Sequence, residues 1–251
     1  MAAEFNLGIL PANSTPVIAS NFVGSNDTRD TFSFSLASSG NINLALTGMS
    51  SDADVRLFRD FNGNGIVDAG DTQIGSSTRG GNSDDSINIA NQVAGNYVVQ
   101  VDRFSGDTKY DLRVSTTAFP SASNLLPTET EVGILTGTQT FTGQVSNNST
   151  AANNESPGDT SDVYHFVLNA AGNHTFTIAG LSGDADLRLI QDTNSNLVVD
   201  AGEAIATSAN AGTTSDQITR FLNPGEYFVQ VYSFAGLPND SSQINYTLTM
   251  T

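Results

Sequence analysis

The stretch Asp30-Thr31-Phe32-Ser33-Phe34-Ser35-Leu36 alternates apolar residues with Thr and Ser at every second position. Successive side chains of a β-strand point to opposite faces, so this alternation predicts a strand with one buried face. The same period recurs at residues 42–46, 55–57, 87–89, 97–101 and 110–114, and again at 164–166, 176–178, 187–189, 227–231 and 246–248. Helical periodicity of useful length is absent from the sequence. Short strands separated by Gly, Asn and Asp predict an all-β protein with jelly-roll-like β-sandwich architecture.

The sequence contains two copies of one unit. Phe34 and Asp60 correspond to Phe166 and Asp192 at a constant spacing. Each copy is roughly 120 residues long, a normal domain size, which favours tandem domains over a solenoid. The expected parts are a first domain at residues 1–119, a linker containing Ser and Pro at 120–129, and a second domain at 130–251. The second copy also inserts Leu237-Pro238-Asn239-Asp240-Ser241-Ser242 before its last strand.

Each copy contains a twelve-residue segment, residues 60–71 and 192–203, with oxygen-bearing side chains at loop positions 1, 3, 5, 9 and 12. Ca²⁺ takes six to eight oxygen ligands at about 2.3–2.6 Å, and this spacing supplies them together with a backbone carbonyl from position 7. The sequence therefore predicts one calcium site in each domain, with Ca²⁺ as the bound cofactor. The expected ligands are Asp60, Asn62, Asn64, Ile66, Asp68 and Asp71 in the first loop, and Asp192, Asn194, Asn196, Val198, Asp200 and Glu203 in the second.

Both loops are flanked by predicted strands, so they are not EF-hands and no helix-opening switch is expected. An Asx-rich turn without an ion is the alternative, since Asn, Asp and Gly favour turns for conformational reasons alone. The loops differ at position 6, where a sharp turn is needed and Gly65 is replaced by Leu197. A left-handed leucine would cost about 1–2 kcal/mol. Position 12 is Asp71 in the first loop and Glu203 in the second, and Glu is the better bidentate ligand, so the two differences oppose each other.

Composition limits the classes of partner. The chain has 26 acidic and 9 basic residues and a formal net charge of −17, which argues against nucleic acid or an anionic membrane as a partner. Cysteine is absent, which excludes disulfides and thiolate metal sites. No apolar run is long enough to insert in a membrane, and residues 1–5 lack the features of a signal peptide. These features are compatible with a secreted bacterial protein that is stabilised by metal rather than by disulfides, so we expect an extracellular or cell-surface location.

Several short motifs resemble one known family, the bacterial pre-peptidase C-terminal (PPC) domain. They are Asp27-x-x-Asp30-x-Phe32-x-Phe34, Gly48-Met49-Ser50-Ser51-Asp52-Ala53-Asp54-Val55-Arg56-Leu57, Ala94-Gly95-Asn96-Tyr97 and Tyr110-x-Leu112, with second-copy matches at Asp159, Asp162, Gly180-Leu181-Ser182-Gly183-Asp184-Ala185-Asp186, Pro224-Gly225-Glu226-Tyr227 and Tyr246-x-Leu248. The resemblance implies a non-catalytic β-sandwich found on secreted proteases and other exoproteins, with relatives in clostridial collagenases that bind collagen and calcium. The family has a shorter turn where this chain has its twelve-residue loops, so the loops are an elaboration.

Further acidic residues are candidates for additional metal ligands. Asp52, Asp54, Asp184 and Asp186 precede the loops on the predicted strands, and their alternative role is as hydrogen-bonded strand-edge carboxylates. The resemblance to the collagen-binding relatives also implies an ion site near the start of each domain. Its candidate ligands are Asp27, Asp30, Asp159 and Asp162, which could instead cap a turn.

Catalysis is poorly supported by the sequence. His165 and His174 have no histidine counterparts in the first copy, and the clustered carboxylates already have a calcium interpretation. Phe104, Tyr232 and Phe234 are the best candidates for ligand contact at the surface. We expect a non-catalytic binding or adhesion module whose partner is an extracellular matrix protein or a polysaccharide. Two alternatives stay open: homotypic assembly into a surface layer or filament through exposed sheet edges, and an accessory part of a secreted peptidase.

Overall fold

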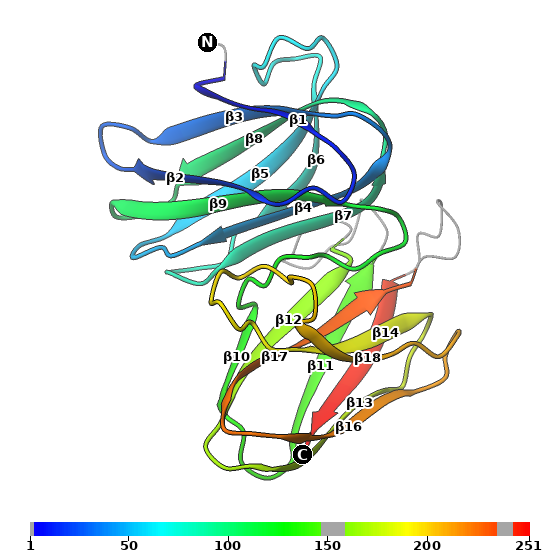
Figure 1. Ribbon diagram of the computed structural model, residues 1–251. Helices are drawn as coiled ribbons and strands as arrows, with labels where there is room; N and C mark the ends of the chain where they lie inside the picture. The colour runs from blue at the N-terminus through cyan, green and yellow to red at the C-terminus, as the bar shows by residue number, and fades with distance from the viewer. Residues whose placement is uncertain (1–2, 147–158, 235–242) are drawn as a thin grey trace. The chain divides into compact units, whose positions relative to one another are not determined.

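The computed structural model describes residues 3–146, 159–234 and 243–251 (Figure 1). The predicted insertion at residues 237–242 lies outside these residues. The described secondary structure consists of strands and bridges, and none of it forms a helix that could cross a membrane. The all-β prediction is therefore confirmed.

By their contacts, the described residues divide into two compact units. The first contains the chain through Pro127 and also Asp159, and the second contains residues 128–146 and the chain from Thr160 onward. Residues 120–127, which the sequence placed in a linker, are thus grouped with the first unit. In this segment the Ser121 carbonyl accepts a hydrogen bond from Asn41 Nδ2 at 2.8 Å.

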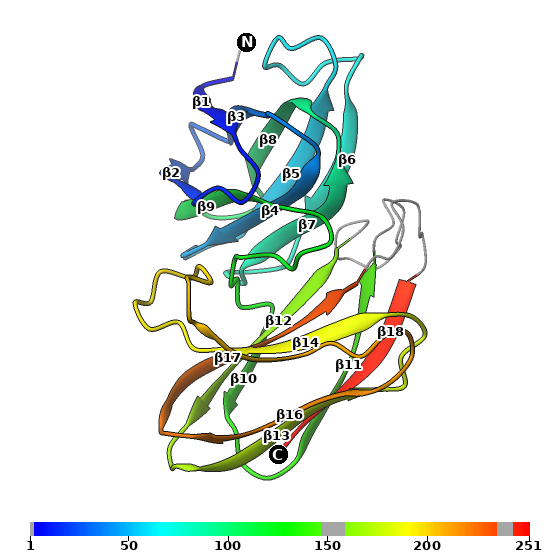
Figure 2. The same cartoon turned by 45° about the vertical axis from the view of Figure 1, so that its right-hand side comes forward.

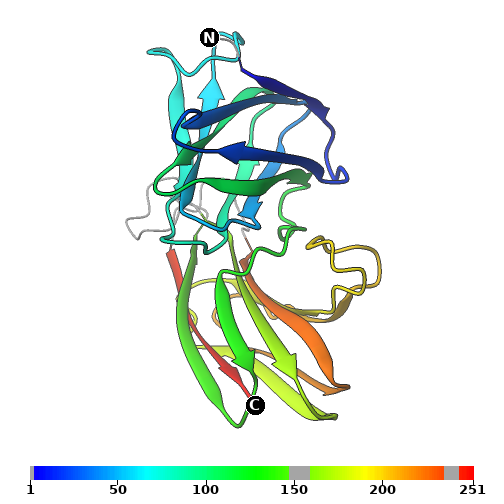
Figure 3. The same ribbon diagram turned by 90° about the vertical axis from the view of Figure 1, so that its left-hand side faces the viewer.

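The first unit has two sheets, in which all neighbouring strands except β5 and β6 are non-consecutive in sequence (Figures 2 and 3). The five-stranded sheet has the order β1 (Phe5–Leu10), β3 (Arg29–Leu36), β8 (Gly95–Arg103), β5 (Ala53–Asp60) and β6 (Thr72–Ser77). The four-stranded sheet has the order β2 (Val17–Val23), β9 (Thr108–Thr117), β4 (Gly40–Thr47) and β7 (Asp85–Gln92). Only β1, which pairs with β3, lies parallel to its neighbour within these two sheets.

The core of the first unit lies between these sheets. Phe32, Leu57 and Val99 come from the five-stranded sheet and Leu44 and Leu112 from the other, and each is at most 1% exposed. Fully burying a side chain of this size contributes about 1.5–3 kcal/mol relative to leaving it exposed. As the alternating pattern predicted, β3 is a strand whose inward-facing residues form part of the sandwich core.

The second unit repeats this topology strand for strand. Its five-stranded sheet has the order β10 (Thr130–Ile134), β12 (Ser161–Leu168), β17 (Gly225–Ser233), β14 (Ala185–Ile190) and β15 (Ala204–Ser208). Its four-stranded sheet has the order β11 (Gln139–Ser146), β18 (Gln243–Met250), β13 (Gly172–Ala179) and β16 (Asp216–Leu222). The parallel pairing recurs at β10 and β12. The two β-sandwiches are therefore tandem copies of one fold.

Candidate metal-binding sites

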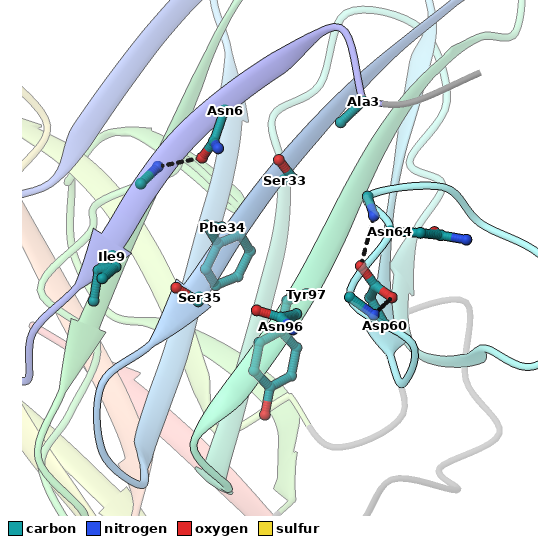
Figure 4. Close-up of a pocket in the computed structure, with 13 residues that line it drawn as sticks. Ala3, Asn6, Ile9, Ser33, Phe34, Ser35, Asp60, Asn64, Asn96 and Tyr97 are labelled. Atoms are coloured by element: carbon teal, nitrogen blue, oxygen red, sulfur yellow. Dashed lines mark hydrogen bonds between the residues drawn. The ribbon is translucent and has the colours of Figure 1, made fainter.

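The first twelve-residue loop connects β5 to β6 at one end of the five-stranded sheet and begins at Asp60, the last residue of β5. The Asp60 side chain is held at the centre of the turn: its Oδ1 accepts the Gly63 N–H at 2.7 Å and its Oδ2 accepts the Gly65 N–H at 2.9 Å (Figure 4). Asp60 is 3% exposed. The backbone N–H groups at loop positions 4 and 6 thus fix the orientation of the position-1 carboxylate.

The middle of the first loop is a chain of side-chain hydrogen bonds. Asn62 Oδ1 accepts the Asn64 N–H at 3.0 Å, and Asn64 Oδ1 accepts the Ile66 N–H at 2.7 Å. Both Asn side chains donate from Nδ2 to Asp68 Oδ2, at 3.0 Å and 2.9 Å. The Gly70 N–H contributes most, and the two amides next, to a pKa of Asp68 below its usual value. Asp68 is therefore an anion at neutral pH.

Position 12 closes the first loop on itself. Asp71 Oδ1 accepts the Phe61 N–H at 3.1 Å and Oδ2 accepts the Asp68 N–H at 3.0 Å. The same carboxylate thus joins the beginning of the loop to its ninth position. The side chains at positions 1, 3, 5, 9 and 12 all take part in hydrogen bonds within the loop.

The second loop, between β14 and β15, has the same plan. Asp192 accepts the N–H groups of Asn196 and Leu197 at 3.2 Å and 2.8 Å. Asn194 and Asn196 both donate from Nδ2 to Asp200 Oδ2 at 2.9 Å. The loops share most of their hydrogen bonds, although Asp60 accepts from position 4 where Asp192 accepts from position 5, and their residues differ at positions 2, 4, 6, 7 and 12.

Glu203 closes the second loop with more contacts than Asp71 makes in the first. Its Oε1 accepts both the N–H and the hydroxyl of Thr193 at 2.8 Å, and its Oε2 accepts the Asp200 N–H at 3.0 Å. Burial raises the pKa of Glu203, but these hydrogen bonds outweigh it, so the pKa lies below its usual value. The carboxylate at position 12 is 5% exposed.

Positions 4 and 6 of both loops have left-handed backbone. The φ angles are 69° at Gly63 and 68° at Gly65, against 56° at Ser195 and 58° at Leu197. Leu197 therefore takes the conformation that position 6 of the pattern requires, where a residue with a side chain costs about 1–2 kcal/mol relative to glycine. The turn geometry does not depend on glycine.

The donor set of each loop consists of carboxylate, amide and carbonyl oxygens, which fits a hard cation such as Ca²⁺ and offers no nitrogen or sulfur ligand for a softer one. The Asp60, Asp68 and Asp71 carboxylates belong to one loop, but they do not bring one oxygen each within 4.8 Å of one another, so a bound cation would have to draw them closer together. For the side-chain oxygens of Asn62, Asn64 and Asp68 to face a bound ion, the two amides would have to break their hydrogen bonds to Asp68.

The first unit also brings together Glu4, Asp27 and Asp30, whose carboxylate oxygens lie within 4.8 Å of one another. Within residues 3–146, 159–234 and 243–251, no other three acidic side chains lie this close. Asp30 is 2% exposed, and burial is the main cause that raises its pKa to about 6, with the charges of Asp27 and Glu4 adding to it and a hydrogen bond from Tyr110 opposing it. The cluster has the donor chemistry of a second hard-cation site.

The sequence predicted Asp27 and Asp30 as candidate ligands of this site, but Glu4 was not among the predicted residues. The parallel pairing of β1 with β3 brings Glu4 to them, since the Glu4 N–H donates to the Thr31 carbonyl at 3.0 Å and the Thr31 N–H donates to Glu4 Oε2 at 3.3 Å. A signal was present in the repeat: Glu4 and Glu129 each lie three residues before the matching strands Leu7-Gly8-Ile9-Leu10 and Val132-Gly133-Ile134-Leu135.

The corresponding residues of the second copy share part of the arrangement of Glu4, Asp27 and Asp30. Glu129 accepts the Val163 N–H, as Glu4 accepts that of its own neighbouring strand. Asp162 is 9% exposed. Asp159 is also buried, but it is grouped with the first unit, whereas Asp162 is grouped with the second.

Asp52 and Asp54 lie at the opposite end of β5 from the loop, and Asp184 and Asp186 are placed likewise on β14. At about 3.3 Å per residue, the six positions from Asp54 to Asp60 span roughly 20 Å. These four aspartates therefore cannot ligate an ion held by the loops. They are near the loops in sequence, but an extended strand keeps its two ends apart; a role of these aspartates at an additional metal site stays a prediction.

The two histidines have ordinary contacts. His165 Nδ1 lies 2.6 Å from Glu131 Oε2, and its ring packs on Phe228 with centroids 4.9 Å apart. His174 Nδ1 lies 3.0 Å from the Thr251 carbonyl. Neither contact forms an acid–base pair with a nucleophile.

Of the predicted surface aromatics, Phe104 is 69% exposed and Phe234 41% exposed. Tyr232 is half-buried and hydrogen-bonded to Asp186, so its hydroxyl is engaged in the structure. Phe61, at position 2 of the first loop, was not singled out from the sequence and is 66% exposed.

A cavity of about 360 Å³ lies beside the first loop, where Asn6, Ser33, Ser35 and Asn96 come from β1, β3 and β8 (Figure 4). The polar side chains of its lining carry neutral amide and hydroxyl groups, with Asp60 the acidic exception, and Ala3, Ile9 and Phe34 add apolar surface. In the second copy, the positions of Ser33 and Asn96 are held by His165 and Glu226. The neutral cavity is thus a property of the first copy's sequence.

Comparison with known proteins places these observations in one family. The sequence profile of the bacterial pre-peptidase C-terminal domain matches residues 28–103 and 160–233. The solved pre-peptidase C-terminal domain of a collagenase from Bacillus anthracis is similar, with 19% identity over 50% of this chain and 97% of that chain and a TM-score of 0.34. PliG, a periplasmic inhibitor of g-type lysozyme from Aeromonas hydrophila, is similar at 18% identity over 49% of this chain and 95% of that chain, with a TM-score of 0.30. No curated protein matches the sequence. Since the two profile matches together span more than half of the sequence, the chain belongs to the bacterial pre-peptidase C-terminal domain family, as two tandem copies of that domain.

Proposed function

We propose that this protein is a non-catalytic binding module of a secreted or cell-surface bacterial protein, and that Ca²⁺ stabilises both of its domains. Domains of this family are generally non-catalytic β-sandwich modules, and they occur in secreted bacterial proteins. The strongly acidic composition and the absence of cysteine accord with metal rather than disulfides as the stabilising element.

The observation that carries the calcium proposal is the common geometry of the two loops. In each, the position-1 aspartate accepts backbone N–H groups within the turn, and the position-12 carboxylate returns to accept one at position 2. Two loops with different residues at positions 4, 6 and 12 reach this arrangement independently. A turn formed only by local Asx preferences would not need the return of position 12.

Calcium acts here by electrostatics and by ordering. The ion neutralises carboxylates that repel one another and fixes a connection that packs little apolar surface of its own. A ligand that binds only the folded state stabilises it by RT ln(1 + [L]/Kd), about 2.7 kcal/mol at a hundredfold excess over Kd. The Glu4, Asp27 and Asp30 cluster supports a further calcium site in the first domain.

For the macromolecular partner, we propose a polysaccharide, bound at the cavity beside the first loop. Amide and hydroxyl groups such as those of Asn96 and Ser35 match the hydroxyls of a neutral sugar, and none of the described residues that line the cavity is basic and could select an anion. Binding of a panel of neutral extracellular polysaccharides in the presence of calcium tests this step. Asn96→Ala should weaken binding, whereas the corresponding change in the second domain, Glu226→Ala, should leave it unchanged.

The irregular register of the edge strands argues against self-assembly through the edges of the five-stranded sheets. Each edge of both five-stranded sheets carries an irregular register, between β1 and β3, β5 and β6, β10 and β12, and β14 and β15. Bulges of this kind protect edges against pairing with another chain. Light scattering with and without calcium tests the alternative, which requires a calcium-dependent increase in mass.

The central experiment compares the melting temperature in millimolar calcium with that in excess chelator. Calcium should raise it and chelation should lower it. Magnesium should substitute poorly, because it demands octahedral geometry and gives up its water reluctantly. Equal melting temperatures with calcium and with chelator would contradict the calcium proposal.

A further inference from the structure

The first twelve-residue loop contains the only two Asn-Gly pairs of the chain, Asn62-Gly63 and Asn64-Gly65. Both asparagines are exposed to solvent. In an Asn-Gly pair, the glycine nitrogen can attack the side-chain Cγ of the asparagine, because glycine has no side chain to hinder the approach and its backbone adopts many conformations. The first loop therefore contains two places where the chain can react with itself.

The second loop has no such pair. Its asparagines at the same positions are followed by larger residues, in Asn194-Ser195 and Asn196-Leu197. A side chain on the attacking residue restricts its backbone and hinders the approach to Cγ. The two loops share most of their hydrogen bonds, so they differ in this reactivity mainly through positions 4 and 6.

The reaction is a deamidation with water as the co-reactant. A bond forms between the glycine nitrogen, which loses its proton, and the asparagine Cγ. The Cγ–Nδ2 bond breaks, and Nδ2 leaves as ammonia, so that a cyclic succinimide closes on the main chain. Water then opens one of the two C–N bonds of the ring and yields aspartate or isoaspartate. No oxidant or reductant is needed, and this reactivity is one reason why asparagine is a thermolabile residue.

The closed loop holds both nitrogens that would attack. The N–H groups of Gly63 and Gly65 donate to the two oxygens of Asp60, at 2.7 Å and 2.9 Å (Figure 4). Hydrogen bonds to an ionised carboxylate are among the stronger ones in proteins. Each glycine nitrogen must therefore leave Asp60 before it can lose its proton and reach Cγ.

The two asparagine side chains are held as well. Oδ1 of Asn62 accepts the Asn64 N–H at 3.0 Å, and Oδ1 of Asn64 accepts the Ile66 N–H at 2.7 Å. Each Nδ2 donates to Asp68 Oδ2. Closing the succinimide turns Cγ toward the next nitrogen and removes Nδ2, so these contacts must break. The reaction thus starts from the locally opened loop, and its rate depends on how often the loop opens.

We propose that Asn62 and Asn64 are sites of spontaneous deamidation, and that Asp60 restrains the reaction while the loop is closed. The product changes the loop in two ways. Aspartate places a carboxylate where an amide donates to Asp68 at 2.9–3.0 Å, and the two like charges repel each other in the absence of an ion. Isoaspartate adds a carbon to the main chain and alters the turn itself. The second loop keeps its amides, so the two domains become chemically different as the protein ages.

The first test incubates the full chain in chelator at mildly alkaline pH. Peptide mapping then separates the asparagine, aspartate and isoaspartate forms of each loop. Asn62 and Asn64 should convert faster than Asn194 and Asn196 by on the order of tenfold, with the second loop as a control inside the same molecule. Equal rates in the two loops, or a first loop that stays unconverted, would overturn the proposal.

The second test removes the restraint. Asp60→Ala frees both glycine nitrogens and should speed conversion of the first loop by about tenfold. Asp192→Ala makes the matched change in the second loop and should leave its asparagines slow. Asp68→Ala frees the two amides, should act in the same direction as Asp60→Ala, and serves in its place if Asp60→Ala does not fold. An unchanged rate in the folded variant would show that these contacts do not restrain the reaction.

Only the effect of calcium on the rate rests on the proposed function. Saturating calcium should slow conversion of the first loop, because an ion that binds the closed loop lowers the population of the open one. If Asp60→Ala raises the rate and calcium leaves it unchanged, the calcium proposal fails and the deamidation site stands. If calcium slows the reaction and Asp60→Ala leaves it unchanged, the restraint by Asp60 fails and the calcium proposal stands.

Discussion

The two loops and two clusters of aspartates differ between the copies in opposite ways. The clusters are Asp52, Asp54 and Asp85 in the first copy and Asp184, Asp186 and Asp216 in the second. The loops keep most of their hydrogen bonds on partly different residues, with Leu197 where the first has Gly65. The clusters keep their aspartates and differ in what surrounds them, with Asn210 where the first has Arg79. In the loops, the carboxylates at positions 1 and 12 therefore determine the geometry and glycine is dispensable at a cost. In the clusters, the neighbours determine how the negative charge is offset.

The strongest test of the equivalence of the loops removes position 1 from each. Asp60→Ala and Asp192→Ala should each abolish one calcium site, and each should remove up to about 2.7 kcal/mol of calcium-dependent stability at a hundredfold excess over Kd. Because the substitutions lie in different domains, their effects should add in the double variant. Titration calorimetry gives the stoichiometry, and a double variant that binds as many ions as the unsubstituted protein would exclude these residues as ligands.

The pH dependence of stability tests the cluster of the first unit. Burial, the main cause, raises the pKa of Asp85 to about 7, against hydrogen bonds from the Arg79 N–H and the Ser77 hydroxyl. The folded state therefore binds this proton more tightly than the unfolded state, so the contribution of Asp85 to stability is present below about pH 4 and is lost as the pH rises to about 7. Asp85→Asn should remove this loss and stabilise the protein by a few kcal/mol at pH 8, with little effect at pH 4. Denaturant unfolding at the two pH values measures it, and equal effects at both would contradict the assignment.

Gly65→Leu makes the first loop resemble the second at position 6. The left-handed backbone at Gly65, with φ of 68°, should then cost about 1–2 kcal/mol, and calcium should bind the first loop more weakly by a corresponding factor. An added Cβ would meet only ordinary contacts, the nearest at 3.6 Å to Ala3, so the loss should come from the backbone. Gly80→Leu, outside the loops and with no neighbour near its Cβ, is the control. Unchanged affinity in Gly65→Leu would mean that the bound loop turns differently.

Leu197→Gly is the reverse change and should have the smallest effect. Relief of the left-handed strain at Leu197, with φ of 58°, should strengthen calcium binding at the second loop. Glycine also loosens the ion-free loop, which costs entropy on binding, so the gain should be below 1–2 kcal/mol, about 0.5 kcal/mol. Weaker binding in this variant would show that the conformation of the second loop changes when the ion binds.

Much of the fold could be predicted because its signals are local. The alternation in β3 identifies a strand from seven residues, and the spacing of Asp60 to Asp71 places its oxygens around one turn whatever the rest of the chain does. The repeat then doubles each signal, so the tandem β-sandwiches follow from the sequence.

The missed residues are those that only pairing between strands brings together. Glu4 reaches Asp30 through the parallel pairing of β1 with β3, and Asp216 reaches Asp186 from a different sheet. Asp54 shows the converse, since it is near Asp60 in sequence although the extended strand β5 places the two residues at its opposite ends. Distance along a strand is fixed by geometry, but its neighbours across the sheet depend on the whole topology.

The position of the loops also bears on how long the protein survives among secreted proteases. Each loop is the covalent connection to an edge strand, β6 or β15, and several residues of each loop are exposed, among them Phe61 in the first. Such connections open locally at a lower free energy than the sheets do, and exposed loop tips are preferred sites of cleavage. A single cut there would leave the edge strand attached to its sheet only by its pairing and to the chain at one end. If the loops bind calcium as proposed, the calcium concentration of the surroundings would set the lifetime of the protein, because a bound ion would make the loop open to a protease less often.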